Sequence, residues 1–315
     1  RGSLVFTRTT ENPIDADLII LDEVSMVDTP LMAHFLEAVG PGTRLVLVGD
    51  TNQLPSVGPG NILKDLIASG ILPCTELTLI KRQDKGLIIR NCHQIKNGED
   101  IKLGNSTARD FFVLKRKDEG GILETLLDLV TKRLPESYQA DRLREIQVIT
   151  PLRTRTELSC KALNEAFQQH LNPETKIDGC RFKVGDKVIQ NKNHYDLEII
   201  NGDIGYVLDI SKPGQTITVA FEYPNRVVEL PLNDNDLELA YAITCHKFQG
   251  SEARIVVIPI HRAFGKLIMQ RNWLYTAVSR AREICILVGQ REEIPKIIRR
   301  DQQQRRFTRL AERLQ

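Results

Sequence analysis

Two short, uninterrupted apolar runs near the start of the chain constrain its fold more than any other feature. They are Asp17-Leu-Ile-Ile-Leu-Asp22 and Arg44-Leu-Val-Leu-Val-Gly-Asp50. Continuous rather than alternating hydrophobicity predicts strands that are buried on both faces, as in the centre of a parallel sheet. Residues 30–38, between the runs, have helical spacing of apolar side chains and end at Gly40-Pro41-Gly42. The sequence therefore predicts a βαβ unit, whose functional groups gather where the strands end.

Later segments predict a second α/β sheet with an insertion. Three further apolar runs lie at residues 145–150, 254–259 and 283–289, and helical patterns accompany them at 157–170 and 273–281. Short β-type runs separated by turn pairs occupy 182–190, 203–210, 215–222 and 226–232. They predict a small antiparallel β-barrel inserted into this second domain. The tail from 291 to 315 carries eight basic and four acidic side chains and predicts a charged terminal helix.

Composition excludes several classes of protein and points to a polyanionic partner. No apolar run approaches the about 20 residues of a membrane span, and the first residues lack the apolar core of a secretory signal. The six cysteines form no close pairs, which favours a reducing, cytoplasmic compartment.

Charge is distributed unevenly along the chain. Residues 1–80 hold 4 Lys+Arg and 10 Asp+Glu, a net charge of −6, so the total of +2 leaves +8 for residues 81–315. Either the later part binds a polyanion or this charge is ordinary solvated surface.

Polar side chains follow both of the first two predicted strands. Asp22-Glu23 ends the first, an arrangement with which NTPases hold Mg²⁺ on one carboxylate and polarise the attacking water with the next. Gln53 follows the second strand, where its amide could reach a γ-phosphate. Paired acids also occur as plain loop entries, but the ends of neighbouring parallel strands converge in space.

An ordered set of motifs over residues 15–289 resembles the superfamily 1 helicases of the RecD-like type. Residues 22–28 and 49–60 resemble the Walker B and third motifs, and residues 79–83 resemble the arginine segment of the fourth. Residues 150–153 and 163–165 are similar to the opening of the second motor domain. Residues 184–188 and 201–205 resemble the inserted barrel. The fifth and sixth motifs correspond to His246-Lys-Phe-Gln-Gly-Ser-Glu252 and Tyr275-Thr-Ala-Val-Ser-Arg-Ala281.

The resemblance implies a fold and a set of roles. It implies RecA-like P-loop NTPase motor domains, the first incomplete over 1–80 and the second over 81–177 and 236–315, with the barrel at 178–235. ATP and Mg²⁺ are the implied cofactors. The implied catalytic residues are Glu23 as general base, Gln53 as γ-phosphate sensor and the arginine fingers Arg82 and Arg280. Asp22 would coordinate Mg²⁺, Gly250 and Glu252 would lie at the nucleotide, and Thr244, His246 and Lys247 would contact single-stranded DNA.

Two departures from the family pattern limit this expectation. No Gly-x-x-x-x-Gly-Lys-[Ser/Thr] phosphate loop exists in the 315 residues, so the chain is expected to be a fragment with negligible ATP turnover by itself. Phe248 also occupies a place where the family usually has a small residue, which leaves the local DNA contact open.

The resulting hypothesis is an ATP-dependent DNA helicase or translocase, with 5′→3′ travel suggested by the family. It would act on single-stranded DNA and duplex junctions in DNA repair and recombination, as a monomer, with nuclease or recombination proteins as further partners. The alternatives are a catalytically silent DNA-binding or partner-docking subunit of a nuclease–helicase complex, and an RNA-directed relative. The intact set of catalytic residues argues against the silent subunit.

Overall fold

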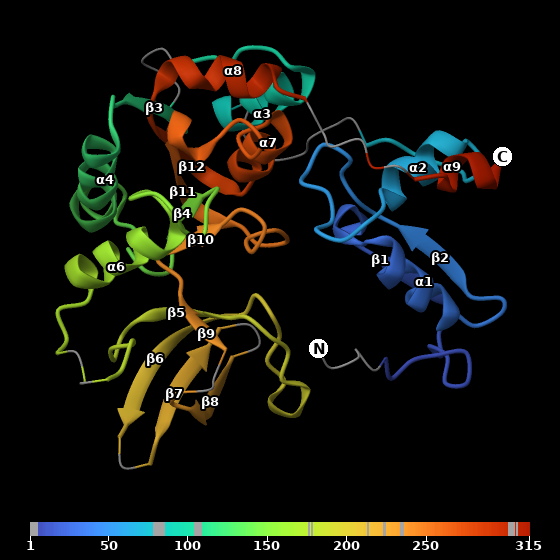
Figure 1. Cartoon of the computed structure of the whole chain (residues 1–315), viewed down its shortest axis with the longest axis horizontal. Helices are drawn as coiled ribbons and strands as arrows, with labels where there is room; N and C mark the ends of the chain where they lie inside the picture. The colour runs from blue at the N-terminus through green and yellow to red at the C-terminus, as the bar shows by residue number, and fades with distance from the viewer. Residues whose placement is uncertain are drawn as a thin grey trace. The chain divides into compact units, whose positions relative to one another are not determined.

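The computed structural model describes most of the chain, as two compact units (Figure 1). The first unit comprises residues 1–84 and 301–315, and the second comprises residues 85–300. The described residues are 6–77, 86–103, 109–175, 177, 179–212, 214–222, 225–233, 236–301, 306 and 308–315.

The first unit is built on the predicted βαβ element. Strands β1 (Leu18–Leu21) and β2 (Arg44–Leu47) pair in parallel, with Leu18 opposite Arg44 and Leu21 opposite Leu47. Helix α1 (Thr29–Glu37) connects them, and the short helix η1 (Val24–Met26) follows β1 directly. Helices α2 (Ile62–Ser69) and α9 (Leu310–Leu314) complete the unit and contact each other. The βαβ prediction is confirmed.

The prediction that these strands are buried on both faces is wrong. One face packs on a core of Val24, Met32, Ile62 and Leu63, to which α1 and α2 both contribute. On the other face Leu18 is 49% exposed and Ile20 63% exposed, and Val46 and Val48 are exposed as well. The sequence pattern records that both faces are apolar, but the helices of this unit cover one of them.

The second unit contains the predicted second parallel sheet, in the strand order β10-β4-β11-β12-β3. Its strands, from that edge, are β10 (Ala242–Thr244), β4 (Ile146–Thr150), β11 (Ala253–Ile260), β12 (Ala281–Gly289) and β3 (Phe111–Lys115). Every residue of β4 is buried, and β11 is buried except for one half-exposed position, as expected for interior strands. The edge strands β3 and β10 were not predicted.

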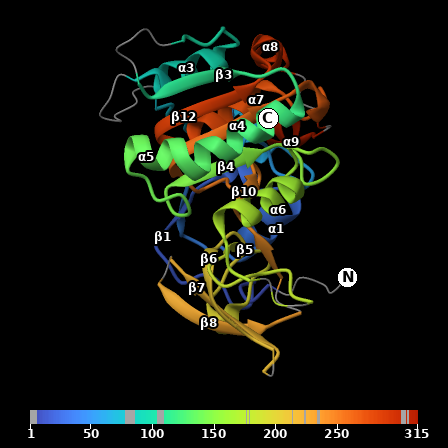
Figure 2. The ribbon, with the colours of Figure 1, turned by 90° about the vertical axis from the view of Figure 1, so that its left-hand side faces the viewer.

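Helices cover both faces of this sheet, as Figures 1 and 2 show. Helices α3 (Leu87–Asn97), α7 (Arg271–Ser279) and α8 (Ile294–Arg299) lie on one side, where α7 contacts both of the others. On the other side α4 (Glu119–Asp128) contacts α6 (Cys160–Leu171) and continues through η2 (Leu129–Arg133) into α5 (Leu134–Tyr138). Helices α6 and α7 correspond to the two predicted ones.

The insertion is an antiparallel sheet in the order β8-β7-β6-β5-β9. Its strands, in chain order, are β5 (Lys187–Gln190), β6 (Ile204–Ser211), β7 (Thr216–Phe221), β8 (Arg226–Pro231) and β9 (Leu237–Leu239). The first four follow the predicted runs, and β9, which was not predicted, leads into β10 of the parallel sheet. The insertion has its own core, which includes Phe182, Ile217, Val219 and Phe221.

The C-terminal tail differs from the single charged helix that the sequence predicts. After η5 (Arg291–Glu293) and α8, the backbone becomes extended at Arg300 (φ −83°, ψ 103°). Residues 301–315 then belong to the first unit, although the sequence placed them in the second motor domain. The reason is that Leu310 packs against the core of the first unit and α9 lies against α2. Among the described residues, no helix is long and apolar enough to cross a bilayer.

Candidate functional site

The ends of β1 and β2 lie side by side in the first unit. The Val48 N–H donates to the Leu21 carbonyl at 2.8 Å, and the Val24 N–H donates back to the Val48 carbonyl at 2.9 Å. A Cβ atom on Gly49 would lie 2.9 Å from Leu63 Cδ2 and 3.2 Å from the Val24 nitrogen, so the absence of a side chain at residue 49 favours this close approach of η1. The segments that begin at Asp22 and at Gly49 are therefore neighbours, as the strand pattern predicts.

Asp22 and Glu23 stand in a tight, locally hydrogen-bonded turn. The Glu23 N–H donates to Asp22 Oδ1 at 2.7 Å, and Glu23 adopts a left-handed conformation with φ of 53°. A residue other than glycine in this region costs about 1–3 kcal/mol and recurs at functional sites. Asp22 is exposed. Among the described residues no group of three or more His, Cys, Asp or Glu side chains is placed to hold a metal ion. A single exposed carboxylate nevertheless fits Mg²⁺, which keeps several waters and takes its other ligands from substrate phosphates.

Gln53 lies in a turn that Asp50 organises. Asp50 Oδ1 accepts from the Asn52 N–H at 2.9 Å, and the Gln53 N–H donates to the Asp50 carbonyl at 3.2 Å. A hollow of about 10 Å³ lies against Gln53, Ser25 and Asn61, which is roughly the space of one water molecule. The turn therefore places Gln53 and Ser25, which follows the end of β1, beside the same small hollow.

The second unit brings the fifth and sixth motifs together. After β10, the Lys247 and Phe248 N–H groups both donate to the Thr244 carbonyl, and Gly250 has a φ of +77° that favours glycine. Arg280, at the end of α7, is only 6% exposed, and its Nη1 donates to the Ser251 carbonyl at 3.3 Å. The Ala253 N–H donates to the Arg280 carbonyl at 3.0 Å. Arg280 thus hydrogen-bonds to the chain at Ser251 and Ala253, where the fifth motif ends.

The other predicted contacts of this unit differ in exposure. Thr244 is half-buried, paired with Thr150 in the sheet, while His246 and Glu252 are exposed. Partial desolvation of the His246 imidazole lowers its pKa below the usual 6.5, so the ring is neutral at pH 7. Phe248 is 3% exposed and belongs to the core, so it offers no surface on which a base could stack.

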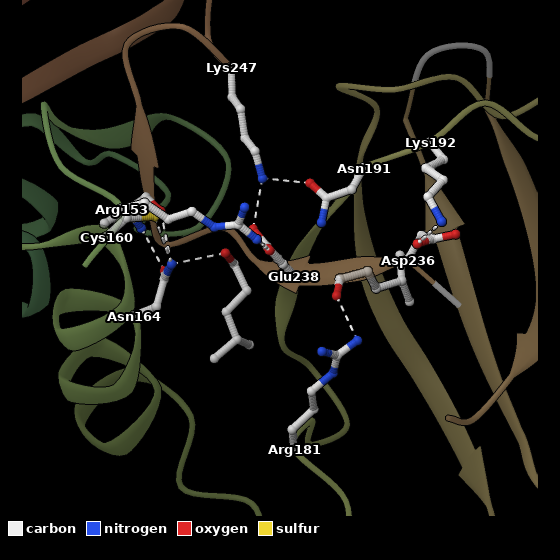
Figure 3. Close-up of polar contacts among 12 residues, drawn as sticks. Arg153, Cys160, Asn164, Arg181, Asn191, Lys192, Asp236, Glu238 and Lys247 are labelled. Atoms are coloured by element: carbon white, nitrogen blue, oxygen red, sulfur yellow. Dashed lines mark hydrogen bonds and ion pairs between the residues drawn. The ribbon is translucent and has the colours of Figure 1, made fainter. Parts of the chain in front are cut away.

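Lys247 is held by an ionic network that joins the insertion to the parallel sheet (Figure 3). Its Nζ donates to Glu238 Oε2 at 2.7 Å and to Asn191 Oδ1 at 2.5 Å. Arg153, which follows β4, donates through Nη2 to the other carboxylate oxygen of Glu238. Burial by itself would raise the pKa of Glu238, but hydrogen bonds and charge from Lys247 and Arg153 outweigh it and lower that pKa. Glu238 is therefore an anion at pH 7 that binds two cations.

Neither Glu238 nor Asn191 was predicted from the sequence. They lie 9 and 56 residues from Lys247, and Arg153 lies 85 residues from Glu238. No spacing rule links positions in different sheets, and β9, which carries Glu238, is too short to produce a strand pattern. A search for acids able to pair with basic motif residues would have found Glu238 only as one of many candidates. Arg82, a predicted arginine finger, lies outside the described residues.

Three family models match successive parts of the chain. Residues 5–115 match an AAA domain, and residues 163–221 match the SH3 domain of ATP-dependent RecD-like DNA helicases. Residues 239–288 match the C-terminal domain of UvrD-like helicases. The SH3 match covers β5 to β7 of the insertion, and the UvrD-like match covers the fifth and sixth motifs.

Related proteins align with nearly the whole chain. The chain is 36% identical, over 90% of its length, to the ATP-dependent RecD2 DNA helicase of Deinococcus radiodurans. It is 30% identical, over 98% of its length, to the RecBCD enzyme subunit RecD of Mycolicibacterium smegmatis. It spans only 38% of the first relative and 56% of the second.

Solved structures share the fold. The crystal structure of a Pif1 helicase from Bacteroides in complex with ADP-AlF3 and single-stranded DNA superposes with a TM-score of 0.57 at 20% identity, covering 88% of this chain and 72% of the other. A second Pif1 structure, at forked double-stranded DNA, gives 0.52 at 19% identity over 88% and 70%. The α/β architecture predicted from the sequence is confirmed.

Proposed function

This chain is a homologue of the RecD-like superfamily 1 helicases, and on that premise we propose that it forms part of the motor of an ATP-dependent DNA helicase. The observation that carries the proposal is the hydrogen-bonded convergence of two strand ends, which brings the Asp22-Glu23 turn beside the Gly49–Gln53 turn. Groups that bind a metal, activate a water and sense a phosphate must act on one small volume. The neighbouring positions of these two turns support such roles for Asp22, Glu23 and Gln53.

The proposed catalytic roles fall on residues of both units. Asp22 would hold Mg²⁺, which neutralises phosphate charge when bound. Glu23 would accept the proton of the attacking water, and Gln53 would orient that water or the γ-phosphate. Arg82 and Arg280 would stabilise charge on the transferred phosphoryl group, with Gly250 and Glu252 at the nucleotide edge. Arg280 is supported by its place beside the Ser251 carbonyl, close in sequence to both of those residues.

Single-stranded DNA is the proposed polymer substrate. The net charge of +8 on residues 81–315 supports a polyanion, and Thr244, His246 and Lys247 would contact its phosphates. The burial of Phe248 supports a grip on the backbone rather than base stacking at this position. The motor would move 5′→3′ and open duplex junctions during DNA repair and recombination, acting as a monomer within the cytoplasm.

The domain boundaries follow the same proposal. The first motor domain would hold residues 1–80, the second 81–177 and 236–315, and the insertion 178–235. Residues 301–315 are the exception, because in the structure they belong to the first unit and not to the second. Within the second unit, the pair Glu238–Lys247 joins the inserted sheet to the parallel sheet.

ATP hydrolysis tests the proposal directly. The full-length protein and its Glu23→Gln variant should be assayed with and without single-stranded DNA. DNA-stimulated turnover that is lost in the variant would support a motor, and unwinding of duplexes with 5′ or 3′ tails would then give its direction. Absence of turnover in the wild type would reject the motor. A competing RNA that binds more tightly than DNA of the same sequence would instead support an RNA-directed enzyme.

The 315-residue chain by itself should hydrolyse ATP negligibly. Its sequence holds no glycine-rich loop with a lysine to bind the phosphates. Turnover by the purified chain that disappears in Glu23→Gln would contradict this expectation.

A second candidate is a silent DNA-binding or partner-docking subunit of a nuclease–helicase complex. It is favoured by one observation, the 30% identity to a protein named as the RecD subunit of a RecBCD enzyme. Wild-type binding to single-stranded DNA without ATP turnover, in the presence of the partner proteins, would support it.

A further inference from the structure

The C-terminal tail places Arg306 against the loop that contains Gln53. This loop, residues 49–60, is called the Gln53 loop below. Arg306 Nη1 donates to Ser56 Oγ at 2.8 Å and to the carbonyls of Gly58 at 2.6 Å and Gly60 at 2.7 Å. Arg306 Nη2 donates to the Ser56 carbonyl. One half-buried guanidinium therefore binds several backbone oxygens of a segment about 250 residues earlier in the chain.

The tail that carries Arg306 is itself anchored. Thr308 Oγ1 hydrogen-bonds to the Asp65 carboxylate on α2. Leu310 packs against the core that contains Ile62 and Leu63, and α9 lies against α2 (Figure 1). These contacts hold Thr308 and Leu310 against the first unit, so the tail loses less backbone conformational entropy when Arg306 binds the loop.

The opposite side of the Gln53 loop packs on the start of α1. The Thr29 N–H donates to the Pro59 carbonyl at 2.8 Å. A Cβ atom on Gly58 would lie 1.9 Å from Asp28 Oδ2, and one on Gly60, which has a φ of +103°, would lie 1.9 Å from Thr29 Oγ1. Residues 56–60 are thus enclosed between α1 and Arg306.

Gln53 lies between this enclosed segment and the turn at Asp50. Its own N–H is bonded to the Asp50 carbonyl, and Leu54, the next residue, is 6% exposed. Releasing residues 56–60 would remove the restraint that follows Gln53 and Leu54 in the loop. Each backbone residue that becomes free gains conformational entropy, so the ordered position of the Gln53 amide would become less populated.

We propose that Arg306 is a positioning residue for Gln53. By holding the carbonyls of Ser56, Gly58 and Gly60, it keeps the Gln53 amide oriented before nucleotide binds, so that no reorganisation is needed during phosphoryl transfer. This inference rests on the proposed function only for the role of Gln53. The attachment of the tail to the loop is a separate structural statement with its own measurement.

Hydrogen exchange in the full-length protein tests the attachment. Arg306→Ala should accelerate amide exchange in residues 54–60 by roughly tenfold or more, while β1 and α1 keep their protection. Arg309→Ala is the matched control, because it removes an arginine of the same tail whose side chain is 79% exposed. Equal exchange in the two variants would overturn the proposal. Uniformly faster exchange throughout the first unit would also overturn it, because Arg306 would then stabilise the unit as a whole.

Steady-state ATP hydrolysis tests the positioning role. With single-stranded DNA present, Arg306→Ala should lower kcat about tenfold and leave the KM for ATP within about twofold, since Gln53 acts in the transition state. Arg306→Lys keeps the charge but lacks the planar fork of donors, and should lower kcat in the same direction. An unchanged kcat despite faster loop exchange would overturn the positioning role. A wild type without turnover would reject the proposed function and this role together, while the exchange data would still decide the attachment.

Discussion

The Lys247 ammonium lies 2.7 Å from Glu238 Oε2, so a basic residue of the fifth motif is neutralised by an acid from the inserted sheet. Arg153 binds the other oxygen of the same carboxylate. Glu238 therefore sits between two cations as a backbone phosphate would. For Lys247 to contact DNA, a phosphate must compete with this carboxylate.

Glu238→Gln should strengthen binding of single-stranded DNA. Loss of the competing charge frees Lys247 and Arg153, so affinity should rise several-fold, and the slope of log K against log salt should steepen by about 0.7 for each additional phosphate that the protein neutralises. Fluorescence anisotropy over a series of salt concentrations measures both quantities. The increase in affinity should vanish when Lys247→Gln is added, which assigns it to this pair.

The control for Glu238 is Glu283→Gln, which removes a carboxylate that binds Arg254 at 2.7 Å and is 58% exposed. If this control raises affinity as much as Glu238→Gln, only net charge matters. Weaker binding by Glu238→Gln would mean that the carboxylate orients the cations instead of competing for them.

In the motor that we propose, Arg280→Ala should abolish most DNA-stimulated ATP hydrolysis by the full-length protein. An arginine that stabilises charge during phosphoryl transfer contributes roughly 10³–10⁵ in rate. Arg282→Ala, two residues away and exposed, is the control that should retain near-normal turnover. Comparable turnover by the two variants would show that Arg280 only supports the Ser251 carbonyl to which it donates.

Asp186 should be essential for the stability of the second unit. It is fully buried, and its carboxylate accepts from Gln168 (2.5 Å), Asn172 (2.7 Å), the Lys183 N–H (2.8 Å) and Tyr241 (2.8 Å). Asp186→Ala leaves these buried donors without their acceptor, which should cost about 3–5 kcal/mol in the free energy of unfolding.

Urea unfolding of the chain measures this loss. Asp209→Ala removes an exposed carboxylate from β6 and should change the free energy of unfolding by less than about 0.5 kcal/mol. A loss of less than about 1 kcal/mol in Asp186→Ala would mean that water replaces the carboxylate.

Lys187 should make stability depend on pH in the alkaline range. Burial lowers its pKa from 10.5 to about 8, although Glu222 and Asp141 act in the opposite direction. Below pH 8 both folded and unfolded states bind the proton, and folding must bury a charge. Between about pH 8 and 10.5 only the unfolded lysine is protonated, so the free energy of unfolding rises with pH by about 3 kcal/mol in total.

Lys187→Met should remove that rise and stabilise the chain near pH 7. Unfolding should be followed from pH 7 to 10.5 in the wild type, in Lys187→Met and in Lys212→Met, which replaces an exposed lysine of the same insertion. A pH profile of Lys187→Met that parallels the wild type would show that the ammonium is sufficiently solvated through its 2.9 Å bond to Gln147 Oε1.

Local sequence patterns predicted those strands whose formation depends on residues that are close together in the chain. The largely apolar runs at 145–150 and 283–289 became β4 and β12, as expected for short segments that are buried within a parallel sheet. The short strands β9 and β10 were missed, since three residues carry too little pattern. The burial of β1 was also mispredicted, because an apolar pattern does not say which surfaces are covered.

The sequence by itself determined the order of the elements, the convergence of the two strand ends and the motifs of a RecD-like helicase. These follow from chain periodicity and from the geometry of parallel strands, which place groups at one edge whatever the rest of the molecule does. Only the tertiary structure decided that Glu238 binds Lys247 and that Arg306 binds the Gln53 loop. Both contacts join segments from different elements, and such pairings depend on how completed sheets and helices pack, which no local pattern of residues encodes.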